Sequence, residues 1–116
     1  MSCSTDKNAF LNRAYHSTTA RYNGYFNANE IINTTYSTFL NSRTEDYNEL
    51  LPIYPLPSIS ESKNWYSPMD TAAAKCELVI YKHRMPHAKK GRSRNKEWCK
   101  WIDDNWMTIG QTKFYK

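Results

Sequence analysis

The sequence predicts an all-α protein built from antiparallel helical hairpins of repeat type, with an extended proline-rich segment between them. Three observations indicate this class. Apolar residues recur at three- and four-residue spacing in separate stretches of the chain. Asparagine and glycine stand where these stretches begin and end, as caps of helices do. The run from Pro52 to Pro57 holds three prolines, which excludes a helix there.

Composition limits the choices further. A chain of 116 residues forms one domain at most. Its mean hydropathy of −0.83 is low, although 15% aromatic residues supply large side chains for a core. No run of eighteen apolar residues exists, so the sequence predicts no membrane-spanning helix.

The first predicted element is a helical hairpin over residues 9–41. Asn8 is placed to cap its first helix, and Gly24 has the position of a helix-ending glycine. Asn27 and Glu30 then have the spacing of a capping box that opens a second helix. We expect a turn around Gly24 and a hairpin core made by the aromatic residues Tyr15, Tyr22, Tyr25, Phe26, Tyr36 and Phe39.

Residues 42–68 form the predicted proline-rich insertion. Leu51–Pro57 cannot be helical, yet it is too apolar for a solvated linker. We expect an extended segment that lies across the helices, with Ile53, Tyr54 and Leu56 covering apolar surface. A long insertion without a function of its own is the simpler interpretation, and we favour it over a functional loop.

Residues 69–116 are predicted to hold a third helix, a basic loop and a fourth helix. The third helix opens at Ser67 or Pro68, and Pro86 ends it. The fourth runs from about Lys96 to the end of the sequence. The apolar stripe of the third helix comprises Met69, Ala72, Ala73, Cys76, Val79, Ile80 and His83.

The fourth predicted helix contains the pattern Trp106-x-x-Ile109-Gly110, followed by Phe114 and Tyr115. This resembles the opening of a tetratricopeptide repeat, whose first helix reads W-x-x-L-G-x-x-Y. In such a repeat a second helix covers the apolar face of the first. We therefore expect the first helix of a repeat cut short, with Trp106, Ile109 and Phe114 uncovered.

The first eight residues form a predicted tether. Cys3 follows a small residue and precedes a polar stretch, as an acylated lipoprotein cysteine does, and an ordinary exposed cysteine is the alternative.

Catalytic and metal-binding motifs are weak. The pattern C-x6-H-x3-H-x11-C formed by Cys76, His83, His87 and Cys99 lacks a closely spaced cysteine pair, so we expect no metal and no cofactor. The sequence has no nucleophile elbow, phosphate loop or HExxH pattern, and we therefore expect no enzyme.

The formal charge of +5 is concentrated locally, since Tyr81–Lys96 holds seven basic residues and no acid. Such a stretch followed by tryptophans is typical of phosphate and base contacts, and nucleic-acid binding by a helical domain is the alternative function that we keep. A solvated loop is the simpler explanation, because runs of charge are usually solvated, and contact with anionic lipid headgroups or an acidic protein partner is a third option. The candidate contact residues are Lys82, Arg84, Lys89, Lys90, Arg92, Arg94 and Lys96.

One family resemblance spans nearly the whole chain. The stretch R-x-Y-H-x-x-T-A-R-Y-N-G-Y-F-N-A-x-E over residues 13–30, just after a Cys-Ser-Thr start, resembles the PorW/SprE family. Its members are tetratricopeptide lipoproteins of type IX secretion and gliding motility. The resemblance continues through Asp46-Tyr47, Leu51–Tyr54, Ser67–Asp70 and Trp101–Lys116.

The resemblance implies an acylated Cys3, an outer-membrane anchor facing the periplasm and a scaffold without catalytic residues. It also implies protein partners, namely the periplasmic ring lipoproteins and the outer-membrane translocon of the secretion machine. It assigns partner binding to no particular residue. Nucleic acid is not among the partners that it implies.

Overall fold

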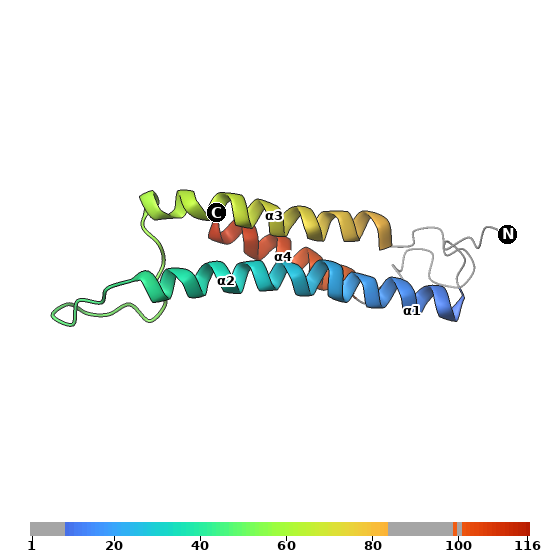
Figure 1. The fold of residues 1–116 in the computed structure, drawn as a ribbon, viewed down its shortest axis with the longest axis horizontal. Helices are drawn as coiled ribbons and strands as arrows, with labels where there is room; N and C mark the ends of the chain where they lie inside the picture. Colours follow the sequence, from blue (N-terminus) through green and yellow to red (C-terminus); the bar gives the residue numbers. More distant parts are fainter. Residues whose placement is uncertain (1–8, 84–98, 100) are drawn as a thin grey trace.

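The computed structural model of the protein is a bundle of three long helical segments that lie alongside one another (Figure 1). The structure describes residues 9–83, 99 and 101–116. The first segment consists of α1 (Phe10–Thr19), the π-helix η1 (Ala20–Phe26) and α2 (Asn27–Ser42), joined end to end. The others are α3 (Ile59–His83) and α4 (Trp101–Tyr115), and each segment runs antiparallel to the preceding one. The described residues include no strand, so the all-α class is confirmed.

The predicted hairpin over residues 9–41 is wrong, because α1, η1 and α2 form one uninterrupted helix. Ala20 and Asn27, where the helix type changes, both have right-handed helical dihedral angles. Gly24 is buried inside η1 rather than in a turn. A glycine in a helical sequence can end the helix or allow another helix to approach closely. Gly24 does the second, because Val79 of α3 lies close against it.

The π-helical stretch receives local support from asparagine side chains. A π-helix shifts the backbone hydrogen-bond register, which disturbs the partners of the carbonyl groups around it. The Asn29 amide donates to the carbonyl of Tyr25 over 2.8 Å, and the Asn27 amide donates to that of Asn23 over 3.4 Å. Asn27, which was interpreted as a cap, therefore bonds backward along a continuing helix, as Asn29 does.

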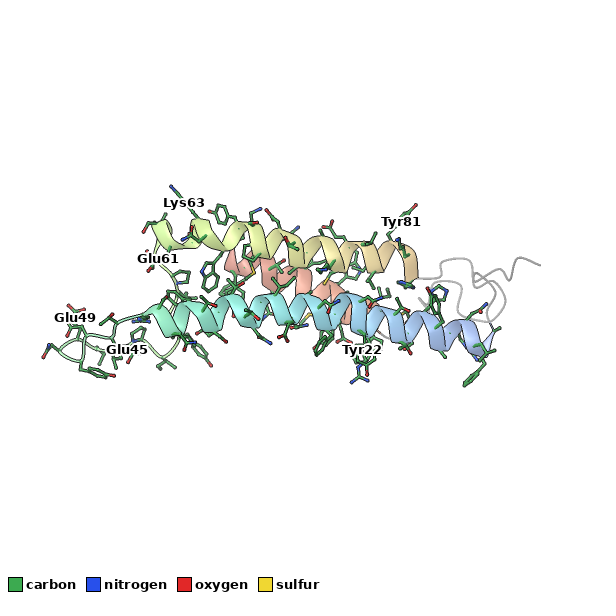
Figure 2. All side chains as sticks on the ribbon, viewed as in Figure 1. Tyr22, Glu45, Glu49, Glu61, Lys63 and Tyr81 are labelled. Carbon is green, nitrogen blue, oxygen red and sulfur yellow. The ribbon has the colours of Figure 1, made fainter. Side chains whose placement is uncertain are left out.

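The core lies along α3, which packs against both other segments. Its stripe is confirmed, since Met69, Cys76 and Ile80 are buried together with most of the predicted set. The aromatic core predicted for the first hairpin is only half right. Tyr25, Tyr36 and Phe39 are partly buried, whereas Tyr15, Tyr22 and Phe26 are exposed; Figure 2 shows Tyr22 pointing away from α3. A single continuous helix turns only one face to the bundle, so the residues on its other face stay outside.

Helix α3 begins earlier than predicted, at Ile59 rather than near Pro68, and Pro68 lies inside it. A capping box opens it: the Ser58 backbone N–H donates to Glu61 Oε2 over 2.9 Å, and the Glu61 N–H donates to Ser58 Oγ over 3.4 Å. These bonds to Ser58, with the charge of Arg43, hold the pKa of the Glu61 carboxyl below its usual value. The S-x-x-E pattern is present in the sequence, but the prediction placed the helix start at Ser67 or Pro68 and did not use it.

Aromatic packing holds this early part of α3 against the bundle. The buried Trp65 ring lies 5.5 Å from that of Phe39 on α2 and 5.7 Å from that of Tyr115 on α4. The Tyr36 ring lies 6.2 Å from Trp65 and 6.3 Å from Tyr115. This contact between all three segments compensates for the backbone donor that Pro68 removes.

Candidate protein-docking surfaces

Helix α4 carries polar and apolar residues on both its buried and its exposed sides. Toward the core it buries Asn105, Thr108 and Thr112 beside Ile102 and Ile109. On the outside it exposes 55% of Trp106, 76% of Met107 and 73% of Phe114. Large apolar side chains gathered on an exposed face mark contact with another molecule more often than contact with water.

The buried polar residues of α4 are bonded mostly to their own helix. Thr108 Oγ1 donates to the carbonyl of Asp104 over 2.9 Å, and Thr112 Oγ1 donates to that of Ile109 over 2.7 Å. The Asn105 amide nitrogen donates to the carbonyl of Trp101 over 2.6 Å. Asn105 Oδ1 has no hydrogen-bond partner among the described residues. A β-carbon built on Gly24 would lie 2.7 Å from this oxygen, so η1 and α4 nearly touch there.

We define the α4 face as Asp103, Trp106, Met107, Gly110 and Phe114. These residues recur at three- and four-residue spacing, so they form one stripe along the helix on the side away from the core. The face borders a groove of about 900 Å³, whose other wall is formed by Tyr25 and Asn29. The groove runs along most of α4, which at 15 residues is about 22 Å long.

Gly110 is the least explained residue of this face. A β-carbon built on it meets no described atom within 4 Å, whereas one built on Gly24 would lie 2.6 Å from Val79 Cγ2. A glycine inside a helix costs about 1 kcal/mol relative to alanine. Within the described residues Gly110 brings no packing gain to offset this cost.

The loop between α2 and α3 is a second exposed apolar surface. The predicted segment lying across the helices is wrong: Ile53, Tyr54 and Leu56 are 92%, 80% and 58% exposed. The loop leaves the end of the bundle, with Glu45 and Glu49 on its outer part (Figure 2). The Tyr36 hydroxyl donates to the carbonyl of Pro55 over 3.5 Å, a long bond that holds the segment near α2. The prolines keep the segment extended, but they do not press its side chains onto the bundle.

At the opposite end of the bundle the structure brings together two buried histidines that sequence reasoning did not pair. His16 Nδ1 lies 2.8 Å from His83 Nδ1, and Tyr15 lies edge-on to both rings. Burial lowers the pKa of His83, and the neighbouring His16 and Lys82 lower it further. Nothing in the sequence pairs residues 67 positions apart, although both histidines follow the helical spacing of their apolar neighbours.

The cysteines of the rejected zinc pattern lie in the core. Cys76 is fully buried, and burial, with the charge of Glu77, raises the pKa of its thiol to about 11. Cys99 Sγ lies 3.8 Å from the carbonyl of His16. Within residues 9–83, 99 and 101–116, His, Cys, Asp and Glu side chains form no group of three that could hold a metal ion.

Cys3, the predicted acylation site, lies outside the described residues. So do most of the predicted contact residues, namely Arg84, Lys89, Lys90, Arg92, Arg94 and Lys96. Lys82 is described and exposed on the last turn of α3. None of the helices in the described part is long and apolar enough to span a membrane. Comparison with protein families, with curated proteins and with solved structures finds no match to this chain.

Proposed function

We propose that this chain is a non-catalytic helical scaffold that binds other proteins through apolar surface turned outward from the bundle. The exposure of Trp106, Met107 and Phe114 on the outer side of α4 carries the proposal. Trp106, Met107 and Phe114 leave large apolar area in contact with water, and a complex with a partner that covered them would be stabilised, because burial of apolar surface contributes about 25 cal/mol per Å². Apolar side chains that point outward do not stabilise the isolated chain, but they can stabilise a complex with another protein.

The resemblance to the PorW/SprE family supports a more specific proposal. The chain would be an outer-membrane-anchored adaptor of type IX secretion and gliding motility, acylated on Cys3 and linking the periplasmic ring to the translocon. In this proposal α4 is the first helix of a tetratricopeptide-type repeat. The exposure of Trp106 and Phe114 supports that role, whereas the continuous first helix supports no repeat in residues 10–42.

Affinity purification tests the scaffold proposal. The tagged chain with its native N-terminus is expressed in a bacterium that has type IX secretion, together with a Trp106→Ser/Phe114→Ser variant. Tyr81→Ser is the matched control, because Tyr81 is 77% exposed and projects from α3 (Figure 2). We expect ring lipoproteins and translocon components to co-purify with the unchanged chain and the control, and to be lost from the double variant.

Circular dichroism checks that all variants keep their helix content. Equal recovery of these components with the double variant would show that they do not bind through α4. If they co-purify with none of the chains, the proposed role in the secretion machine is wrong. The anchor has a separate test. Cys3→Ala should release the chain from membranes and reduce its mass by that of the acyl chains, and unchanged membrane association and mass would contradict the anchor.

A further inference from the structure

We propose that the partner of the α4 face is a second copy of this chain, with the two α4 helices packed antiparallel about a two-fold axis at Gly110. This inference rests on the proposed function, since it names one protein that docks on the outward face of α4. Three features of that face support it: the order of its residues, the placement of its charges and its area.

The order of residues makes the face self-complementary. In a symmetric dimer the same patch of both subunits meets, so residue i of one copy contacts residue j of the other and the reverse. With the axis at Gly110, Trp106 of each copy lies opposite Phe114 of the other. Both rings are more than half exposed. Gly110 then lies against Gly110, where the missing β-carbons let the two backbones approach.

The charges of α4 select the antiparallel arrangement. Asp103 and Asp104 lie in its first turn and Lys113 lies in its last turn. Antiparallel packing brings the acids of each copy to the Lys113 end of the other, whereas parallel packing would place like charges side by side. Opposed helix dipoles favour the same arrangement. Lys116, which bonds Asp70 of its own chain over 2.8 Å, is already engaged.

The available area predicts a weak dimer. Rings of this size bury about 150–250 Å² each when fully covered. At their exposures of 55–76%, Trp106, Met107 and Phe114 offer roughly 400 Å² per copy. With the residues around them, two copies would bury about 1,000 Å², near the lower limit for a specific interface. We therefore expect dissociation in the micromolar range.

Sedimentation velocity of the full chain over a range of concentrations is the test. The unchanged chain should sediment as a monomer when dilute and as a dimer when concentrated. Trp106→Ser/Phe114→Ser should weaken association about tenfold or more, and Tyr81→Ser should leave it unchanged. Gly110→Leu should abolish association, because the leucine side chains would separate the two α4 helices at the axis.

A charge exchange tests the antiparallel arrangement. Asp103→Lys alone and Lys113→Glu alone should each weaken the dimer about three- to tenfold. The combined variant, which exchanges the two charges within one chain, should regain the affinity of the unchanged chain. Rescue is specific to self-association, because an unrelated partner would meet two reversed charges.

Three outcomes would overturn the inference: a monomer at every concentration, a dimer that is insensitive to Trp106→Ser/Phe114→Ser, or absence of rescue in the exchanged variant. The proposed function fails differently. If the chain stays monomeric and the same double variant still loses its co-purifying proteins, another protein occupies the α4 face. In that case the scaffold proposal stands and the second copy does not.

Discussion

Gly24→Ala adds one methyl group at the place where all three segments of the bundle meet. The added carbon would lie 2.6 Å from Val79 Cγ2, 2.7 Å from Asn105 Oδ1 and 2.9 Å from Val79 Cβ. Val79 is β-branched and buried, so its side chain cannot rotate away freely. Overpacking of this kind costs about 1–3 kcal/mol, and better helix propensity returns about 1 kcal/mol. We expect a net loss of up to about 2 kcal/mol in the free energy of unfolding.

Gly110→Ala is the matched control. It makes the same chemical change inside a helix of the same bundle, but at an exposed position instead of a buried one. No described atom lies within 4 Å of the added carbon, so only the gain in helix propensity remains. We expect the variant to be more stable than the unchanged chain by about 0.8–1 kcal/mol. A change of 1 kcal/mol corresponds to about 4–8 °C in Tm for a domain near this size.

Thermal and urea unfolding followed by circular dichroism measure both effects. The protein is kept dilute, so that association through the α4 face does not enter the comparison. Opposite signs for the two variants are the expected result. If Gly24→Ala unfolds at or above the temperature of the unchanged chain, η1 does not approach α3 and α4 as closely as the structure shows. A destabilising Gly110→Ala would mean that Gly110 is packed within the chain.

Three further predictions concern single elements. Because burial lowers the pKa of His83 below its ordinary value of 6.5, the stability contributed by its neutral form is complete above that pH. It is lost as the pH falls through the lower folded value, so urea midpoints at pH 7.5 and 5 should differ less in His83→Gln. In a Cys3→Ser background, Cys76 and Cys99 should react with a thiol reagent only on unfolding, and fast reaction in native buffer would contradict their burial. Ser58→Ala should lower the free energy of unfolding by about 1 kcal/mol, and an unchanged urea midpoint would mean that the capping box is not formed.

Local patterns identified the parts of the fold that local physics decides. The stripe of α3 was predictable, because residues at helical spacing must share a face and an apolar face must be buried. The exposure of Trp106 and Phe114 was also predicted, because the pattern resembles the first helix of a repeat without the second helix that would cover it. Ile109 was grouped with them, but it lies on the core side and is buried.

Patterns that serve two purposes led to the errors. Gly24 followed by Asn27 and Glu30 fits both a turn between two helices and one helix with a close contact, and only the positions of Val79 and Asn105 distinguish them. Pro68 indicated a helix start, yet the packing of Trp65 carries the helix through it.

The sequence by itself determined that the chain is helical, which face of α3 is buried and that the run of prolines is not a helix. The tertiary structure alone decided the number of helices before residue 43, the pairing of His16 with His83 and the burial of Ile109 on the core side of α4. Helical periodicity depends on residues three or four positions apart, and a sequence displays those directly. Contacts between segments join residues far apart in the sequence, such as His16 and His83, which are 67 positions apart. These contacts form only when the helices pack against one another, so local sequence patterns do not reveal them.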